Sequence, residues 1–277
     1  QIVADMAKVL GKKAEAIAYA ERAAKIRSAF RKEYLDSDGK MRGDTQAGYA
    51  LGWVFGLFDP SQAAQVEKHL LAAIDRYQGR LTTGFHSTRC LLLTLDDLGQ
   101  TALAYKLALS TDFPGWGYSI ANDATTIWER WDGYVKGRGF QDAGMNSFNH
   151  WAFGAITEWL VGTVLGIQPL GNDGFRTFRI RPRPGGGLTW AKGSYHSLRG
   201  KITVSWKLSD DRWVCHTTVP PNTEATITLP ADAVRDCQVG GKPLKAGGGI
   251  RALRKEAGGV TFVAAPGTYE FVVTQLR

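Results

Sequence analysis

The stretch IQPLG, residues 167–171, separates two regions with different hydrophobic periods. From residue 7 to this point, apolar residues recur every three or four positions, which is the spacing of an amphipathic helix. Beyond it, apolar and polar residues alternate, as in KITVSWKL at residues 201–208, and alternation is the spacing of a half-buried β-strand. We therefore predict a helical domain at residues 1–167 and a β-domain at residues 168–277.

Turn signals divide the helical region into helix pairs. The sequence DPS at residues 59–61 predicts a helix start with Ser61 as the N-cap, and LGQ at residues 98–100 is expected to separate two short helices. A last helix is predicted to begin near Asn146 or Ser147. It would bury one wide apolar face made of Phe148, Trp151, Ala152, Ala155, Ile156, Trp159 and Leu160.

Short strands are expected throughout the second region, separated by turn clusters such as PGGG at residues 184–187. Five to eight short strands at this spacing predict an antiparallel β-sandwich or a jelly roll. The whole chain is therefore predicted to have an α + β fold with two domains. Besides residues 201–208, the candidate strands are residues 178–181, 213–219, 225–229, 260–263 and 269–273.

The composition, with 44% hydrophobic and 22% charged residues, is typical of a soluble globular protein that can bury a core. The longest apolar stretch, residues 49–58, is too short to span a bilayer, so no membrane association is expected. The formal net charge is +8, but no basic run of five or more residues occurs, and we expect no nucleic-acid partner. The chain opens at Gln1 within a helical pattern, which predicts that it is part of a longer polypeptide.

The cysteines Cys90, Cys215 and Cys237 show no metal-binding spacing and are predicted to be free thiols. A bridge between Cys215 and Cys237 stays open as an alternative. The sequence DSDG at residues 36–39 resembles the start of a calcium loop, but it lacks the downstream glutamate and predicts a turn that ends a helix. No metal or organic cofactor is indicated.

Residues 112–151 combine aromatic side chains with acids, amides and a histidine. A pyranose offers apolar C–H faces that pack on indole rings, together with hydroxyls that need fixed donors and acceptors, so this composition suits a sugar site. The alternative is that the aromatic residues fill a helical core. The residues concerned are Trp116, Tyr118, Asp123, Trp128, Glu129, Arg130, Trp131, Asp132, Asn146, Asn149, His150 and Trp151.

Glu129 is a candidate catalytic carboxylate because glycoside hydrolysis requires a pair of carboxyl groups. It stands between Trp128 and Trp131 in the sequence, next to Arg130. A neighbouring glutamate and arginine are also common in structural ion pairs. From these residues alone, both the catalytic and the structural interpretation stay open.

Three linked motifs resemble the bacterial α-L-rhamnosidase family: FPGWGY at residues 113–118, ATTIWERWDG at 124–133 and MNSFNHWAFG at 145–154. The resemblance extends over most of residues 44–166, and the β-rich tail agrees with the small β-sandwich that follows the catalytic domain in these enzymes. It implies a partial (α/α)6 barrel of helix pairs and hydrolysis of terminal α-L-rhamnosides with inversion at the anomeric carbon.

The resemblance also implies roles for particular residues. Glu129 matches the general base that activates water, and His150 matches a histidine that binds the sugar. Trp116 and Trp128 would form walls of the pocket, whereas Asn146 and Asn149 are expected to cap a helix or brace a loop.

The departure from the family pattern concerns the general acid. In the family it is a glutamate within an acidic motif that ends in Gly-Trp, and the sequence ALGW at residues 50–53 is not preceded by such acids. Asp132 lies near Glu129 but would stand beside the base and not on the leaving-group side. We therefore expect this chain to be inactive alone, with a rhamnose-containing glycoside and the missing N-terminal part of the same enzyme as its partners.

Two alternative functions stay open. Another (α/α)6 carbohydrate-active enzyme, either a hydrolase or a lyase that uses Tyr118 or His150 with Arg130, would share the fold. A non-catalytic carbohydrate-binding fragment would instead use aromatic residues of the β-domain, of which Trp190, Tyr195 and Trp206 are the candidates. The bacterial cytoplasm, the periplasm and secretion are all compatible with the sequence.

Overall fold

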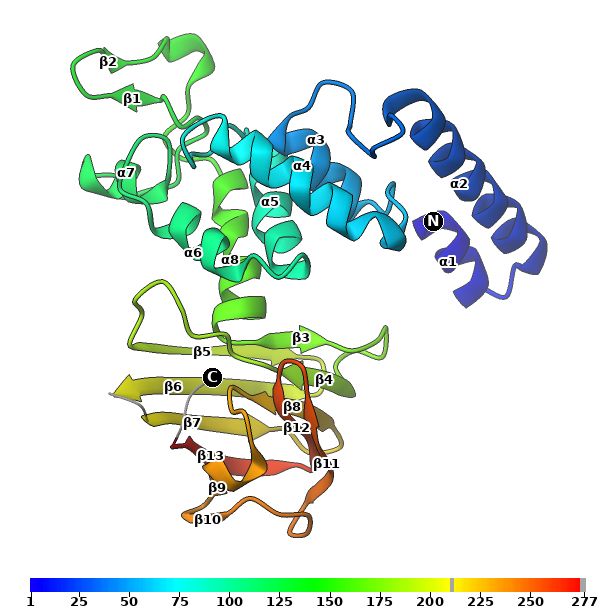
Figure 1. Cartoon of the computed structure of the whole chain (residues 1–277), viewed down its shortest axis with the longest axis vertical. Helices are drawn as coiled ribbons and strands as arrows, with labels where there is room; N and C mark the ends of the chain where they lie inside the picture. The colour runs from blue at the N-terminus through cyan, green and yellow to red at the C-terminus, as the bar shows by residue number, and fades with distance from the viewer. Residues whose placement is uncertain (210–211, 275–277) are drawn as a thin grey trace. The chain divides into compact units, whose positions relative to one another are not determined.

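A computed structural model describes residues 1–209 and 212–274 (Figure 1). The chain forms two compact units, Gln1–Gly154 and Ala155–Arg277. The first is mainly helical and the second is rich in β-strands, which confirms the predicted fold class. The compact units divide at residues 154 and 155, and the domain boundary predicted at residues 167 and 168 stays a prediction.

The first unit is built from successive helices whose apolar faces form one core. Fully buried residues come from neighbouring helices, including Tyr49, Leu70, Leu91 and Tyr105. In the described residues, no helix is both long and apolar enough to cross a membrane. The helices are α1 (Ile2–Val9), α2 (Lys13–Tyr34), α3 (Gln46–Val54), α4 (Ala63–Asp75), α5 (Phe85–Asp97), α6 (Thr101–Leu109) and α7 (Trp116–Ala121), followed by a hairpin of β1 (Tyr134–Val135) and β2 (Gly139–Phe140).

The turns between helices agree with the sequence in one case and differ in another. The sequence at residues 98–100 separates α5 from α6, as predicted. At the predicted start after residue 59, however, Asp59 and not Ser61 is the N-cap. Its carboxylate accepts the Ser61 N–H at 3.1 Å, and Gln62 accepts the Asp59 N–H at 2.8 Å. Pro60 occupies the first helical position, so the residue before it, Asp59, is the N-cap.

The predicted helix start at Asn146 or Ser147 is wrong. Residues 147–150 form no helix, because the Ser147 carbonyl and the His150 N–H bond to the segment 127–129 and are not available for helical hydrogen bonds. Helical structure begins only at η3 (Ala152–Ala155), continues in α8 (Ile156–Trp159) and ends in the π-helix η4 (Leu160–Val164). Consequently the side chain of Trp151, which was predicted to be buried, is 79% exposed.

Asp44 connects the segment between α2 and α3 to the end of α4. Its carboxylate accepts a hydrogen bond from the buried Tyr49 hydroxyl at 2.8 Å, lies 3.1 Å from the Lys40 ammonium, and pairs with Arg76. Partial burial acts to raise the pKa of Asp44, but the hydrogen bonds from Tyr49, Lys40 and Arg76 outweigh burial and hold the pKa below its ordinary value of 3.8. Asp44 is therefore ionised at neutral pH.

Replacing Asp44 with alanine is expected to lower the free energy of unfolding by about 2–3 kcal/mol at neutral pH, because three donors lose a charged acceptor. A lowered folded pKa stabilises the folded chain above the unfolded pKa, and this contribution is lost as the pH falls through the folded pKa. The difference between the two proteins in urea unfolding should therefore shrink below about pH 4. Glu33→Ala, which removes an exposed pair with Arg42, serves as the control and should have a smaller effect. If the difference in free energy of unfolding between Asp44→Ala and the unchanged chain stayed the same at low pH, the ionised Asp44 carboxylate would not be its cause.

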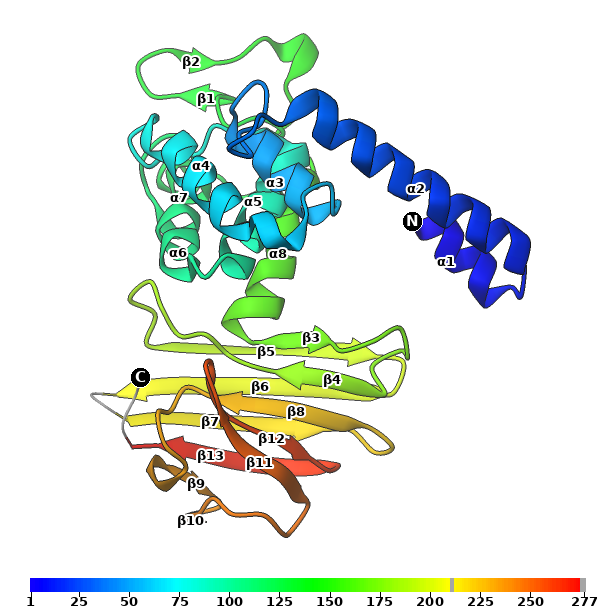
Figure 2. The ribbon, with the colours of Figure 1, turned by 45° about the vertical axis from the view of Figure 1, so that its right-hand side comes forward.

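The second unit consists of two sheets (Figure 2). One has the strand order β10-β9-β13-β7-β6-β5 and the other β11-β12-β8-β4-β3. Among the described pairs, β4 and β8 are parallel and the others are antiparallel. The strands are β3 (Ile167–Pro169), β4 (Thr177–Ile180), β5 (Trp190–Ser197), β6 (Gly200–Ser209), β7 (Arg212–Val219), β8 (Glu224–Leu229), β9 (Cys237–Val239), β10 (Lys242–Pro243), β11 (Ile250–Glu256), β12 (Gly259–Ala264) and β13 (Gly267–Val273).

Alternating residues of these strands form the core of the second unit. Along β6, Ile202, Val204 and Trp206 are buried, and the residues between them are more exposed, as the alternation predicted. The indole N–H of Trp206 donates to the Val164 carbonyl at 2.7 Å. Trp206 is therefore a core residue and not available for the carbohydrate contact that was considered for it.

The cysteines are free and buried. Cys215 is paired with Phe271 and Cys237 with Val273, so β13 lies between the two cysteine-bearing strands. Two strand spacings amount to about 9–10 Å, which exceeds the roughly 7 Å that a disulfide can bridge. Burial raises the pKa of the Cys215 thiol to about 12, which keeps it protonated. The alternative of a Cys215–Cys237 bridge is therefore wrong.

Candidate active site

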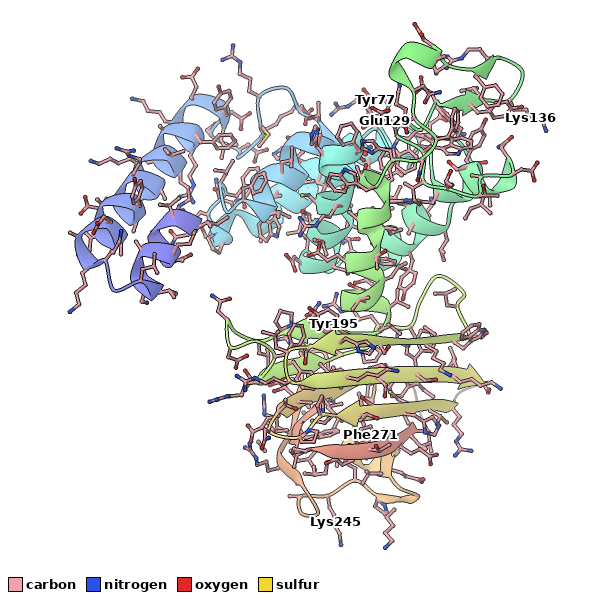
Figure 3. The ribbon with its side chains drawn as sticks, turned by 180° about the vertical axis from the view of Figure 1, so that it is seen from behind. Tyr77, Glu129, Lys136, Tyr195, Lys245 and Phe271 are labelled. Atoms are coloured by element: carbon pink, nitrogen blue, oxygen red, sulfur yellow. The ribbon has the colours of Figure 1, made fainter. Side chains whose placement is uncertain are left out.

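Two irregular segments, residues 126–129 and 147–150, are joined by backbone hydrogen bonds in the first unit and carry Glu129 and His150. The Glu129 N–H donates to the Ser147 carbonyl at 2.9 Å, and the His150 N–H donates to the Ile127 carbonyl at 2.8 Å. The Thr126 hydroxyl donates to the Phe148 carbonyl. These bonds bring together the two residues for which the sequence predicted a base and a sugar ligand. Figure 3 shows Glu129 in the loop that follows α7.

The Glu129 carboxylate is held by the opposite segment. One of its oxygens accepts the Ser147 N–H at 3.0 Å, and the side chain is half-buried. Arg130, its neighbour in sequence, pairs instead with Asp132 at 3.1 Å. Within the described residues Glu129 forms no ion pair. A carboxylate fixed by a single backbone donor keeps acceptor positions with which it can take a proton from water.

His150 is held between aromatic rings. Its ring centroid lies 5.3 Å from that of Phe85 and 6.0 Å from that of Trp151, on which it stacks at an interplanar angle of 17°. Its Nδ1 atom accepts the Ala152 N–H at 3.3 Å. A neutral imidazole that accepts at Nδ1 carries its proton on Nε2. This tautomer can donate a hydrogen bond to a sugar hydroxyl.

Trp116 and Trp128 line one hollow of about 220 Å³. The Trp116 indole N–H donates to the Phe153 carbonyl at 3.0 Å, and Trp131, which lines the same hollow, donates to the Thr83 carbonyl at 2.8 Å. Trp131 also stacks on Phe153, with 3.6 Å between ring centroids. The indole N–H groups of Trp116 and Trp131 thus hold the hollow together and are not available to a ligand.

Trp128 contributes more to the core than to the surface. Its side chain is only 7% exposed and packs edge-on against Tyr134 and Phe148. It also lines a second hollow of about 480 Å³, together with Phe140. Neither Glu129 nor His150 lines either hollow. The role of Trp116 and Trp128 as walls of a sugar pocket stays a prediction.

Asp132 is fully engaged in a local network. Its carboxylate accepts hydrogen bonds from Arg130 and Gln141 and lies 3.4 Å from Arg138. Partial burial acts to raise the pKa of Asp132, but the hydrogen bonds from Gln141 and Arg130 outweigh it and lower the pKa below its usual value. A general acid must hold a proton at the working pH, and Asp132 does not meet this requirement.

The residues required for the lyase alternative are occupied elsewhere. The Tyr118 hydroxyl accepts the Lys136 N–H at 2.9 Å, and the Arg130 guanidinium pairs with Asp132. Neither contact directs these groups toward His150. Within the described residues, moreover, no cluster of three His, Cys, Asp or Glu side chains could hold a metal ion.

Comparison with protein families gives two matches, one in each region of the chain. Residues 1–164 match the bacterial alpha-L-rhamnosidase 6 hairpin glycosidase domain, and residues 166–242 match the bacterial alpha-L-rhamnosidase C-terminal domain. The chain belongs to the bacterial alpha-L-rhamnosidase family. The resemblance of the three sequence motifs is thereby confirmed, and the relatives are glycoside hydrolases.

Two curated relatives illustrate the similarity within this family. An alpha-L-rhamnosidase of Streptomyces avermitilis is 42% identical over 231 residues, which is 83% of this chain and 22% of the relative. An alpha-L-rhamnosidase of Formosa agariphila is 35% identical over 273 residues, which is 98% of this chain and 29% of the relative. The chain thus spans less than a third of the length of these relatives.

Solved structures of family members show the same fold. A Streptomyces avermitilis alpha-L-rhamnosidase complexed with L-rhamnose matches 98% of this chain and 25% of its own, with a TM-score of 0.89 and 38% identity. The native alpha-L-rhamnosidase of Aspergillus terreus matches 99% of this chain and 29% of its own, with a TM-score of 0.84 and 30% identity.

The structure adds supporting residues that sequence reasoning missed. Gln46, at the start of α3, is fully buried; it donates to the Arg80 carbonyl at 2.8 Å and accepts the Thr82 N–H at 3.0 Å. It thereby holds the segment in which the Thr83 carbonyl accepts the hydrogen bond of the Trp131 indole N–H. Phe85, at the start of α5, contacts the His150 ring. The sequence does not show this contact, because the two residues are far apart in the chain. Gln46 and Phe85 both lie within residues 44–166, and the resemblance of this range to the family was the available signal.

Proposed function

We propose that this chain supplies the general base of an inverting α-L-rhamnosidase, and that the general acid comes from a segment outside these 277 residues. The observation that carries this proposal is the pairing of residues 126–129 with residues 147–150. It sets the Glu129 carboxylate on the Ser147 N–H and brings His150 to the same pair of segments. Family membership supports the substrate class, terminal α-L-rhamnosides.

In the proposed reaction, Glu129 takes a proton from a water molecule as that water attacks the anomeric carbon. Attack occurs on the face opposite the leaving group, so the configuration inverts, and the acid protonates the departing oxygen. The two carboxyl groups of such enzymes stand roughly 6.5–9.5 Å apart to admit the water. His150 donates from Nε2 to a sugar hydroxyl, and Trp116 and Trp128 offer apolar walls. The hydrogen bonds from Gln141 and Arg130, which lower the pKa of Asp132, support an acid other than Asp132.

The exposed surface of α1 and α2 supports the proposal that a further segment of the enzyme packs on this chain. No residue of α2 is buried, although the helix has 22 residues. Burial of apolar area is the main stabilising term in folding, and a helix pair this exposed offers a large apolar surface to a partner. We propose that the partner is the N-terminal part of the same enzyme. The exposed apolar residues are Ile2, Val3, Met6, Val9, Leu10, Ile17, Tyr19 and Ile26.

A chimera tests this function. In it, the matching part of the Streptomyces avermitilis relative is replaced by this chain, so that the relative provides all upstream residues. The chimera is expected to release p-nitrophenol from p-nitrophenyl α-L-rhamnoside, and the isolated chain is expected to release none. Proton NMR during the first turnovers should show β-L-rhamnose as the initial product.

Two results would contradict the proposal. Turnover by the isolated chain would mean that the acid lies within these 277 residues. A chimera that is folded by circular dichroism and binds L-rhamnose, yet stays inactive while the parent relative is active, would mean that Glu129 does not serve as the base.

A further inference from the structure

The outward face of the six-stranded sheet carries an unusual set of side chains. The strands β5, β6 and β7 lie side by side there (Figure 2). Register pairs Trp190 with Lys207, and Lys192 with Ser205. On the next strand, Ser205 pairs with His216, and Ser209 with Arg212. We call the set Trp190, Lys192, Ser205, Lys207, Arg212 and His216 the basic sheet face.

These residues alternate with the core residues of the same strands, so they point away from the core. Buried Trp206 separates Ser205 from Lys207, and buried Trp213 follows Arg212. Lys192, Lys207, Arg212 and His216 are exposed. The face is hollowed by a depression of about 280 Å³ along β6 and β7, lined by Ser205, Lys207, Ser209, Arg212, Val214 and His216.

Among the residues that the structure describes, few carboxylates lie close to the cations of the basic sheet face. Within residues 1–209 and 212–274, Lys192, Lys207 and Arg212 form no ion pair, and the nearest carboxylate contact is that of Glu270 with His216 at 3.8 Å. Asp210 and Asp211 lie outside the described residues. Lys192 and Lys207 are diagonal neighbours on adjacent strands, which places their Cα atoms about 7–8 Å apart. Two such ammonium groups can contact two anionic groups of one short oligosaccharide.

Trp190 supplies an apolar surface beside these charges. Its side chain is 65% exposed, whereas Tyr195 on the same strand points to the other side and packs on Phe175 with 4.6 Å between ring centroids. Tyr195 thus packs on the opposite side of β5, and Trp190 stays mostly exposed. An indole flanked by lysines combines a stacking surface for the C–H face of a sugar with charges for its anionic groups.

We propose that the basic sheet face binds an acidic polysaccharide built of uronate sugars, with one sugar ring stacked on Trp190 and the carboxylates on Lys192, Lys207 and Arg212. A carbohydrate is favoured over a nucleic acid because the chain belongs to a glycosidase family. This surface belongs to the second unit and involves neither Glu129 nor His150. Its binding is therefore independent of the proposed hydrolysis, and the two can fail separately.

The full 277-residue chain is titrated with polygalacturonate at low ionic strength, by calorimetry, with dextran as the uncharged comparison. Binding to polygalacturonate and not to dextran is expected. Trp190→Ala, which removes no charge, should weaken it about tenfold. The double change Lys192→Gln with Lys207→Gln should weaken it at least as much, and about 0.5 M NaCl should weaken it further.

A matched control removes two lysines of the same unit elsewhere. Lys245→Gln with Lys255→Gln changes the net charge equally at exposed positions outside this face and should leave the affinity close to unchanged. Absence of binding to polygalacturonate would overturn the proposal, and so would an equal loss in the control pair. Equal binding of double-stranded DNA that is insensitive to Trp190→Ala would also overturn it, because the face would then be a general polyanion surface.

Discussion

Replacing Glu129 with glutamine is expected to lower kcat of the completed enzyme by about a thousandfold, with a small change in KM. General base catalysis is worth roughly 10²–10⁴ in rate, and an amide cannot take the proton of the attacking water. The amide oxygen of glutamine can still accept the Ser147 N–H that now holds the carboxylate at 3.0 Å. The loop should therefore keep its conformation, and steady-state kinetics of the chimera with p-nitrophenyl α-L-rhamnoside measure the loss.

Sodium azide separates loss of the base from loss of structure. Azide is a nucleophile that needs no deprotonation, so it should restore turnover by the Glu129→Gln variant and yield the β-configured rhamnosyl azide. Asp142→Asn is the control, because Asp142 is an exposed carboxylate of the same unit that lines neither hollow. The amide oxygen of asparagine can still accept the Gly144 N–H that Asp142 accepts at 2.8 Å. Retained activity in Glu129→Gln, or no rescue by azide, would refute the assignment of the base.

Replacing Gly166 with alanine is expected to lower the free energy of unfolding of the second unit by about 3 kcal/mol or more. Gly166 has a φ of +75°, a conformation that costs a non-glycine residue about 1–2 kcal/mol. An added Cβ would also overlap the backbone of Arg181 and Pro182. Backbone atoms cannot turn aside as a flexible side chain can, and the Arg181 N–H is bonded to the Gly166 carbonyl at 2.9 Å. Strand β4 would have to shift away from β3.

Two further glycines separate the contributions to this effect. Gly187 has a φ of +78° with no atom within 4 Å of an added Cβ, so Gly187→Ala should cost only the conformational term. Gly171 has open space and no positive φ, so Gly171→Ala should be close to neutral. Urea unfolding of the full chain, followed by the fluorescence of its tryptophans, measures all three. If Gly166→Ala and Gly187→Ala lowered the free energy of unfolding equally, the backbone overlap at Gly166 would be relieved at no cost.

The sequence was informative wherever one local pattern had one structural solution. The alternation at residues 201–208 appears as the buried and exposed faces of β6, because successive side chains of a strand must point to opposite sides. The turn at residues 98–100 separates α5 from α6, because glycine after a helix favours its end. The motifs around Glu129 and His150 indicated the family, which the comparisons confirm.

Sequence reasoning failed where distant segments compete for the same backbone groups. The helix expected from Asn146 does not form there, since the Ser147 and His150 backbone is bonded to residues 127–129. Trp151 is exposed beside His150 for this reason. Helical periodicity was present in the apolar residues, but tertiary hydrogen bonds overrode it.

Local periodicity was enough to predict the order of a helical and a β-rich region, and short motifs were enough to indicate the family. The candidate base and histidine came from the resemblance to that family. Periodicity and motifs can be read locally, because they do not depend on the rest of the chain. The three-dimensional structure was needed for the contact of Glu129 with the Ser147 N–H, the tautomer of His150 and the engagement of Asp132 by Gln141. It also separated buried Trp206 from exposed Trp190. Hydrogen bonds and burial of this kind join residues that are distant in sequence, and only folding brings them together.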